Sequence, residues 1–157
     1  MAAAGEIVAR AARPDDAAAL ANLFLRARRT AMPWLAVVHS DAETREWMAQ
    51  RVVPSGEVAI AEVDGRVVGF AAVGDGWLHH LYVHPKWQGR GVGSALLTEA
   101  QRRSSGGLQC WVFQRNVRAR SFYESHGFRL VEETDGGANE EREPDARYRW
   151  APGDPTR

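Results

Sequence analysis

The pattern of hydrophobic and polar positions predicts short strands alternating with helices. Apolar or alternating runs bounded by turn residues predict strands, and they lie at residues 6–10, 58–63, 67–73, 77–83, 108–113, 128–131 and 146–150. Apolar residues at helical spacing predict four helices, which open at Pro14, after Ser40, near Gly91 and at Asn116. Helices and strands are therefore mixed along the chain.

The order of these elements constrains how the strands pair. Asp64-Gly65 between two apolar runs indicates a tight hairpin, and the turn at 74–76 leads into a third antiparallel strand. The strand, helix and strand between residues 77 and 113 form a crossover of the size that joins parallel strands. We expect an α/β (α+β) fold with a mixed, mostly antiparallel central sheet of about six or seven strands, flanked by about four helices.

Length and composition limit the number of domains and the kinds of partner that we expect. The 157 residues suit a single domain, with a core at about residues 6–150 and a loose tail at 151–157. Lys+Arg 20 against Asp+Glu 20 gives a formal net charge of 0, which favours neither nucleic acid nor a membrane as a partner. The only cysteine, Cys110, excludes an intrachain disulfide. We see no signal peptide or spanning segment, so we expect a cytoplasmic protein.

A glycine-rich stretch separates the strand at 77–83 from the helix that follows. Its residues are Gln88, Gly89, Arg90, Gly91, Val92, Gly93 and Ser94. Glycines permit positive φ, and the N–H groups at a helix start lack intrahelical acceptors, so such a stretch binds anions. The spacing fits neither the G-x-G-x-x-G fingerprint nor the P-loop. We expect a ligand that carries a phosphate or pyrophosphate.

Two segments in register resemble the GNAT superfamily of N-acetyltransferases. The first is the Gln/Arg-x-x-Gly-x-Gly/Ala pattern at Gln88, Gly91 and Gly93, and the second runs from residue 116 through Phe-Tyr at 122–123 to Gly-Phe at 127–128. The resemblance covers residues 6–131 and extends more loosely to residue 150. It implies a GNAT-type fold with splayed parallel strands, and acetyl-CoA as co-substrate. No metal is expected, because the adjacent His79 and His80 diverge and no His-x₃-His or Cys-x₂-Cys spacing lies nearby.

The resemblance also implies where the cofactor binds. The glycine-rich stretch would contact the pyrophosphate, and the pantetheine arm would pair with the main chain of Leu81, Tyr82 and Val83. Asn116 would contact the pantetheine region, although as an N-cap it has an ordinary structural role as well. Arg115, Arg118 and Arg120 either meet the adenosine 3′-phosphate or cover a solvated helix face.

Three side chains are candidates for catalysis. Tyr123 falls on the tyrosine of the Phe-Tyr pair, and a phenol that stays protonated at neutral pH can donate to a departing thiolate; a helical Tyr is otherwise a packing residue. His79 and His80 precede Leu81, where many relatives carry a glutamate, and a histidine can accept the amine proton. Neighbouring strand residues face opposite sides, so we favour His80, with a structural histidine or water alone as the alternatives.

The acceptor is the least defined part of the prediction. Trp34, Trp77 and Trp111 would lie on the acceptor side of a GNAT fold and could wall an aromatic pocket, or fill a core. The stretch 132–145 holds seven acids and one base. If it folds toward the site it favours a cationic amine, and the default is a solvated, mobile loop. Polyamines, aminoglycosides, amino acids and protein amines all remain open.

Together these observations predict an N-acetyltransferase that moves acetyl from acetyl-CoA directly to a primary amine. Cys110 lies mid-strand with no base placed beside it, so we expect a buried small hydrophobe and no covalent acetyl-enzyme. The alternative is a non-catalytic acyl-CoA-binding sensor or regulatory module on the same fold. The expected partner is a small-molecule or peptide amine, and a homodimer is left open.

Overall fold

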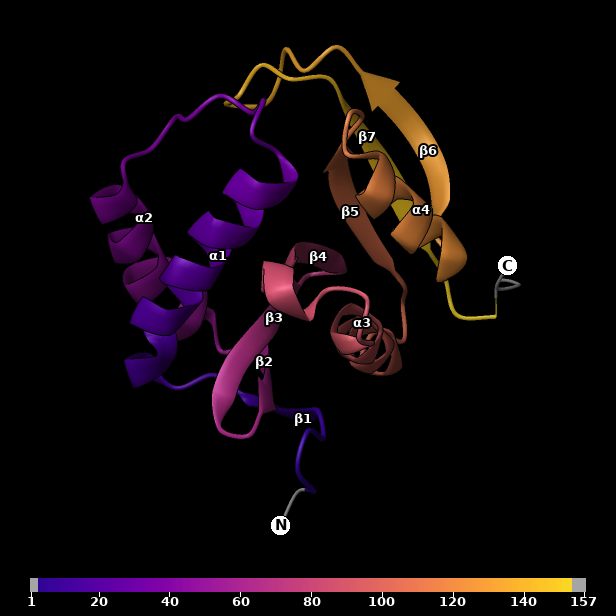
Figure 1. Ribbon diagram of the computed structural model, residues 1–157. Helices are drawn as coiled ribbons and strands as arrows, with labels where there is room; N and C mark the ends of the chain where they lie inside the picture. Colours follow the sequence, from indigo (N-terminus) through magenta and orange to yellow (C-terminus); the bar gives the residue numbers. More distant parts are fainter. Residues whose placement is uncertain (1–2, 154–157) are drawn as a thin grey trace.

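The computed structural model describes residues 3–153 and contains a seven-stranded sheet with four α-helices (Figure 1). The strands are β1 (Val8–Ala11), β2 (Val58–Val63), β3 (Arg66–Gly74), β4 (Trp77–Val83), β5 (Leu108–Phe113), β6 (Arg129–Thr134) and β7 (Asp145–Trp150). The helices are α1 (Ala17–Ala31), α2 (Asp41–Trp47), α3 (Val92–Arg102) and α4 (Val117–Ser125). The predicted elements are confirmed, and no end differs from its prediction by more than three residues.

The sheet is antiparallel except at its centre. Its strand order is β1-β2-β3-β4-β5-β7-β6, and β4 and β5 form its parallel pair. These two strands register at a single position, Trp77 with Gln109, and then diverge, as Figure 1 shows. Beyond that position the β5-facing main-chain groups of β4 have no strand partner among residues 3–153. The predicted splayed parallel strands are therefore present.

The helices cover the two faces of the sheet differently. One core cluster packs α1 and the segment after α2 against β2 and β3, around Leu20, Phe24, Met48, Ile60 and Phe70. The other packs α3 and α4 against the opposite face, which holds Leu96, Leu97, Tyr123 and Tyr148 among others. The sheet therefore lies between two helical layers, with α1 and α2 on one face and α3 and α4 on the other.

A β-bulge in β4 sets which way its side chains face. The register with β3 passes from Ala72 opposite His80 to Val73 opposite Leu78, so His79 is the extra residue. As a result Leu78 joins the α3 cluster, while the ring of His80 packs against Phe24 on α1, with centroids 6.0 Å apart. The bulge keeps His80 on the α1 side of the sheet.

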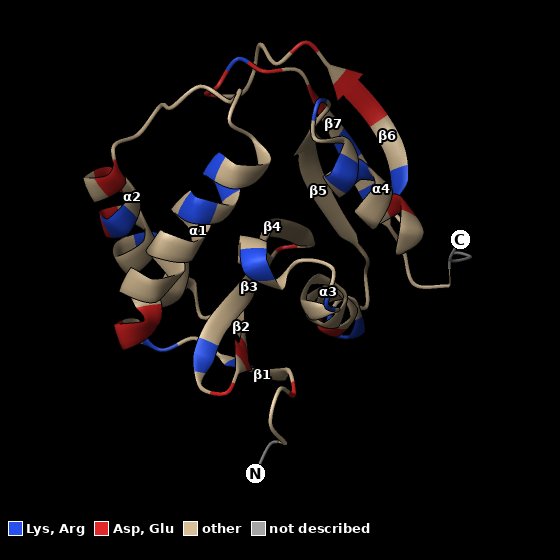
Figure 2. Ribbon diagram, viewed as in Figure 1, with Lys and Arg blue, Asp and Glu red and all other residues tan. Residues whose placement is uncertain are grey.

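The acidic connection between β6 and β7 arches over to the segment that follows α1 (Figures 1 and 2). Glu141 accepts a hydrogen bond from Arg28 at 3.1 Å, and Glu140 lies 2.9 Å from His39. Gly136 has φ 84°, and an added Cβ would collide with the backbone of Glu143, which fixes the path of this loop. The stretch therefore folds toward the α1 side of the sheet, which is the alternative that the sequence left open beside a solvated, mobile loop.

The two ends of the chain lie partly outside the described residues. The loose tail was expected at 151–157, and residues 154–157 lie outside the described residues, as do residues 1 and 2. Within residues 3–153, no helix has the length and apolar character needed to cross a bilayer.

Candidate functional site

The glycine-rich stretch forms the start of α3 as its sequence predicts. Gly89 and Gly91 have φ of 74° and 87°, and Gly91 is the N-cap of the helix. The first helical hydrogen bond runs from the Ala95 amide to the Gly91 carbonyl, so the preceding N–H groups have no partner inside the helix. A Cβ would strain both positive-φ positions, which explains the two glycines.

A cavity of about 550 Å³ lies between this helix start, β4, α1 and α4; we call it the first cavity. Nine of the predicted cofactor residues line it: Leu81, Tyr82, Val83, Gln88, Gly89, Gly91, Gly93, Ser94 and Asn116. Two do not, because Val92 is buried in the core and Arg90 lies over the ring of Trp87 at 4.9 Å. The sequence pattern therefore located most of this wall.

The residues present fit a pyrophosphate and an extended amide-containing arm. The α3 N–H groups provide an anion site, and the edge of β4 that leaves β5 offers main-chain donors and acceptors. Asn116 lines the cavity while its Oδ1 accepts from the Ala119 amide at 3.2 Å, so its capping role is confirmed.

Of the three arginines near α4, only one faces the first cavity. Arg118 lines it, whereas Arg120 donates to the Tyr148 hydroxyl at 2.9 Å. Arg115 lies 4.3 Å over the ring of Trp34 and pairs with Glu143. Arg118 is thus the one placed to meet a phosphate of a ligand in the cavity.

Tyr123 lines the first cavity from α4 and is 9% exposed. Its ring packs against Phe122 and Phe128, each with a centroid distance of 5.3 Å. Burial raises the pKa of its hydroxyl well above the ordinary value, with smaller contributions from Cys110 and Tyr82. The hydroxyl therefore stays protonated at neutral pH.

The two adjacent histidines face different surroundings, as expected. His79 is exposed beside Gly74, whereas His80 packs its ring edge-on to Trp47, with centroids 5.1 Å apart. Burial lowers the pKa of His80 to about 4, and the charges of His79 and Arg28 add to this effect. An ordinary histidine pKa near 6.5 was expected, so this ring is neutral over a wider pH range than the sequence indicated.

A second cavity of about 440 Å³ lies on the α1 and α2 side of the sheet. Apolar and aromatic side chains form most of its wall, together with His80 and several charged groups. Its residues include Phe24, Leu25, Arg28, Met32, Leu35, Val38, His39, Trp47, His80, Glu140 and Glu141. The sequence had placed His80 in a site and had left open whether the stretch that contains Glu140 and Glu141 folds toward it. The other residues were not expected there, because they come from separate segments.

The two cavities adjoin each other. Met32 lines both, and the Tyr82 hydroxyl in the wall of the first accepts a hydrogen bond at 3.1 Å from Arg28 in the wall of the second. Burial alone would lower the pKa of Arg28, but Tyr82 and Glu141 together raise it. A charged guanidinium thus stands at the junction.

The three tryptophans predicted as an acceptor wall line neither cavity. Trp77 and Trp111 stack on each other at 6.5 Å, with Trp111 46% exposed, and Trp34 packs edge-on to Phe113. They lie on β4, β5 and the segment after α1. The structure brings Trp77 and Trp111 together but leaves Trp34 apart from that pair.

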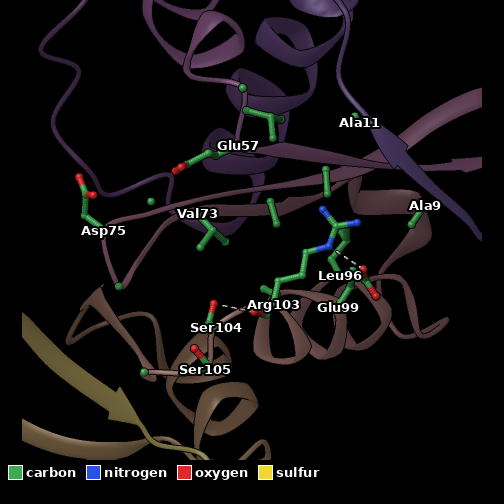
Figure 3. Close-up of a pocket in the computed structure, with 18 of the residues that line it drawn as sticks. Ala9, Ala11, Glu57, Val73, Asp75, Leu96, Glu99, Arg103, Ser104 and Ser105 are labelled. Atoms are coloured by element: carbon green, nitrogen blue, oxygen red, sulfur yellow. Dashed lines mark hydrogen bonds and ion pairs between the residues drawn. The ribbon is translucent and has the colours of Figure 1, made fainter.

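A third hollow, of about 730 Å³, opens between the sheet and the end of α3 (Figure 3). Alanine and glycine form much of its wall, Arg103 pairs with Glu99 at 2.8 Å, and the Ser104 hydroxyl donates to the Ala100 carbonyl. Glu99, Arg103 and Ser104 are thus paired within this stretch of the chain, whereas Glu57 and Asp75 line the hollow from the side of the sheet. Residues 3–153 contain no group of three or more His, Cys, Asp or Glu side chains that could hold a metal ion.

Cys110 is buried, and burial raises the pKa of its thiol to about 12. It lines neither the first nor the second cavity. The expectation of a small buried side chain is confirmed.

Comparisons with known proteins agree on one family. The acetyltransferase (GNAT) domain matches residues 54–130. The L-amino acid N-acyltransferase MnaT of Escherichia coli is 31% identical over 135 residues, which cover 76% of this chain and 77% of MnaT. The peptidyl-lysine N-acetyltransferase YiaC of Escherichia coli is 38% identical over 72 residues, 45% of this chain and 49% of YiaC.

The fold has solved counterparts as well. The PaiA N-acetyltransferase of Thermoplasma acidophilum, solved in complex with coenzyme A, has a TM-score of 0.71 at 18% identity, covering 93% of this chain and 99% of that one. Several sequence alignments are shorter: three curated relatives are covered over 65%, 49% and 41% of their lengths, so the chain spans about half the length of these proteins.

Proposed function

Because the chain belongs to the GNAT family of acetyltransferases, we propose that it moves an acetyl group from acetyl-CoA directly to a primary amine of a small molecule or peptide. One observation carries the proposal. The helix start of α3, the β5-facing edge of β4 and the side chain of Tyr123 all border the first cavity.

The walls of the first cavity supply binding and orientation. The N–H groups at the start of α3 hold the pyrophosphate, with Arg118 beside them, and the main chain of residues 81–83 pairs with the pantetheine arm. When bound, acetyl-CoA supplies the activated acetyl group. A free main-chain N–H of β4 polarises the thioester carbonyl, where negative charge develops during transfer.

An acceptor bound as an ammonium first loses one proton to solvent. Transfer from the neutral amine then forms a C–N bond and breaks the C–S bond, so the sulfur gains one proton and the amine loses one. Tyr123 donates the proton to the sulfur. Its raised pKa opposes this donation, but the same apolar surroundings raise the proton affinity of the departing thiolate. The pKa of the donor hydroxyl and that of the accepting thiol are therefore raised together, so the proton transfer stays favourable.

His80, or water held by it, receives the amine proton. The ring is already neutral at physiological pH because burial lowers its pKa to about 4. Because a histidine with this pKa holds a proton only briefly at neutral pH, the proton passes on to bulk solvent. In this proposal the second cavity holds the acceptor, and the amine reaches the thioester past Met32.

Two relatives are named for the acceptor that they acetylate or acylate. MnaT is named for L-amino acids and YiaC for peptidyl-lysine, and both acceptors present a primary amine. The alternative of a non-catalytic acyl-CoA-binding module is not favoured, because these relatives are named as transferases. It would bind acetyl-CoA and turn nothing over.

Thiol release tests the proposal. The protein is first shown by calorimetry to bind acetyl-CoA, and then assayed for acetyl-CoA-dependent free thiol with polyamines, aminoglycosides, amino acids and peptide amines. Release with one class and not with the others is the expected result. Binding without release from any amine would overturn the proposal in favour of the binding module.

A further inference from the structure

Two opposite charges stand side by side in the wall of the second cavity. Nη2 of Arg28 lies 3.1 Å from Oε2 of Glu141, and these side chains are only 23% and 16% exposed. Arg28 projects from the rigid helix α1, and Glu141 comes from the loop between β6 and β7. The pair is therefore sheltered from solvent.

The other charges of this wall are used elsewhere or lie at its rim. Glu43 accepts from the Ser40 amide as part of the cap of α2. Glu140 pairs with His39, and both side chains are more than half exposed. Arg29 pairs with Asp41 at the surface. The Arg28–Glu141 pair is thus the sheltered charge that a bound molecule would meet.

Both members of the pair keep hydrogen-bonding groups that no partner in residues 3–153 uses. Arg28 donates one hydrogen bond to Tyr82 and one to Glu141, out of the five N–H donors of a guanidinium. Glu141 accepts through Oε2, and the hydrogen bonds found among these residues leave its Oε1 unused. The pair can still bind a carboxylate and an ammonium at the same time.

We propose that the acceptor is a free α-amino acid with an apolar side chain, an inference that rests on the proposed function. Its carboxylate binds Arg28, its amino group lies at Glu141, and its side chain packs against Trp47, Leu35 and Val38. A polyamine or a lysine within a polypeptide would leave Arg28 without a second anion. A zwitterion matches both charges because its own two charges are adjacent.

The test compares acceptors that differ only at the carboxylate. Thiol release is measured with L-leucine, L-methionine and L-phenylalanine, and with the amide and the decarboxylated amine of each. The wild-type protein, Arg28→Met, Arg28→Lys and the control Arg26→Met are compared. Arg26 is exposed on the same helix and lines neither the first nor the second cavity. Calorimetric binding of acetyl-CoA checks that each variant is folded.

The wild-type protein and Arg26→Met are expected to favour at least one amino acid over its amide by about 10- to 100-fold in kcat/KM, the range of a hydrogen bond to a charged group. In Arg28→Met the preference falls to about threefold or less, and Arg28→Lys retains part of it. Equal use of amides and amino acids by the wild type, or an unchanged preference in Arg28→Met, would overturn the inference.

A separate measurement distinguishes this inference from the proposed function. Binding of the three amino acids to the protein with coenzyme A present is followed by calorimetry, which needs no turnover. Arg28-dependent binding without thiol release would uphold the site and overturn the transferase proposal. Thiol release from amines without any carboxylate preference would uphold the transferase and overturn the amino acid site. Absence of both binding and release would overturn the two proposals together.

Discussion

Nη1 of Arg28 lies 3.1 Å from the hydroxyl oxygen of Tyr82, and this contact joins the two cavities of the molecule. Tyr82 borders the cavity beside the start of α3, and Arg28 borders the cavity beneath the loop between β6 and β7. Helix α1 is their common wall, since Ala27 faces one and Phe24 the other. A ligand in either cavity would contact a wall that also shapes its neighbour.

Tyr123→Phe removes only a hydroxyl from the first cavity. Because that hydroxyl is the proposed acid, we expect kcat to fall by about 100-fold or more, the lower range for proton transfer by a positioned side chain. The ring keeps its contacts with Phe122 and Phe128, so acetyl-CoA affinity should change little. Steady-state kinetics and calorimetry measure the two quantities. Unchanged turnover would remove Tyr123 from the chemistry.

His80 is expected to titrate near pH 4, because burial lowers its pKa from 6.5 to about 4. If it receives the amine proton, an acidic limb of kcat is expected near pH 4 in the wild type. His80→Ala should lose this limb, and His79→Ala, at an exposed position, should keep it. An acidic limb that persists in both variants would contradict the role of His80.

The same shift predicts acid sensitivity of folding. Between pH 6.5 and about 4 the unfolded chain binds a proton at His80 that the folded chain does not, so the free energy of unfolding decreases as the pH falls. His80→Gln should flatten this part of the stability profile measured by urea unfolding. A profile with unchanged slope would show that other groups govern it.

Gly91→Ala introduces a Cβ at φ 87°. We expect a loss of about 1–2 kcal/mol from the left-handed conformation and a weaker affinity for acetyl-CoA, because the α3 N–H groups move. Gly106→Ala is the matched control, since Gly106 is exposed, does not have positive φ, and lies outside the first cavity. Equal acetyl-CoA affinities in the two variants would refute the anion site.

Asp16 joins the start of α1 to β1. Arg10 holds its carboxylate through two hydrogen bonds of 2.8 Å, and this pairing, with the Arg13 amide, lowers its pKa to about 2. Its stabilisation is present above pH 4 and is lost as the pH falls toward 2. Asp16→Asn should therefore cost about 2 kcal/mol at pH 7. The cost should shrink at pH 2.5 in urea unfolding, and a pH-independent cost would contradict this account.

Local signals in the sequence predicted most of the fold. Asp64-Gly65 marked the hairpin, Ser40 capped α2 as expected, and the crossover from β4 to β5 indicated the parallel pair. The first cavity was also largely predictable, because the residues of the glycine-rich stretch are consecutive. Such features depend on neighbours along the chain.

The second cavity was not predictable because its wall depends on long-range packing. Arg28 and Glu141 are 113 residues apart, and nothing local to either indicates that they meet. The stacked pair of Trp77 and Trp111 shows the same limit, since the resemblance placed both on the acceptor side without indicating that they contact each other instead of lining a cavity.

The central claim is direct transfer of acetyl from acetyl-CoA to an amine. Incubation of the protein with acetyl-CoA carrying a labelled acetyl group and the amine panel, followed by mass spectrometry of small molecules and protein, tests it most directly. The account predicts label on one amine product and none on the protein, including Cys110. Label retained on the protein, or no labelled amine from protein that binds acetyl-CoA, would contradict it.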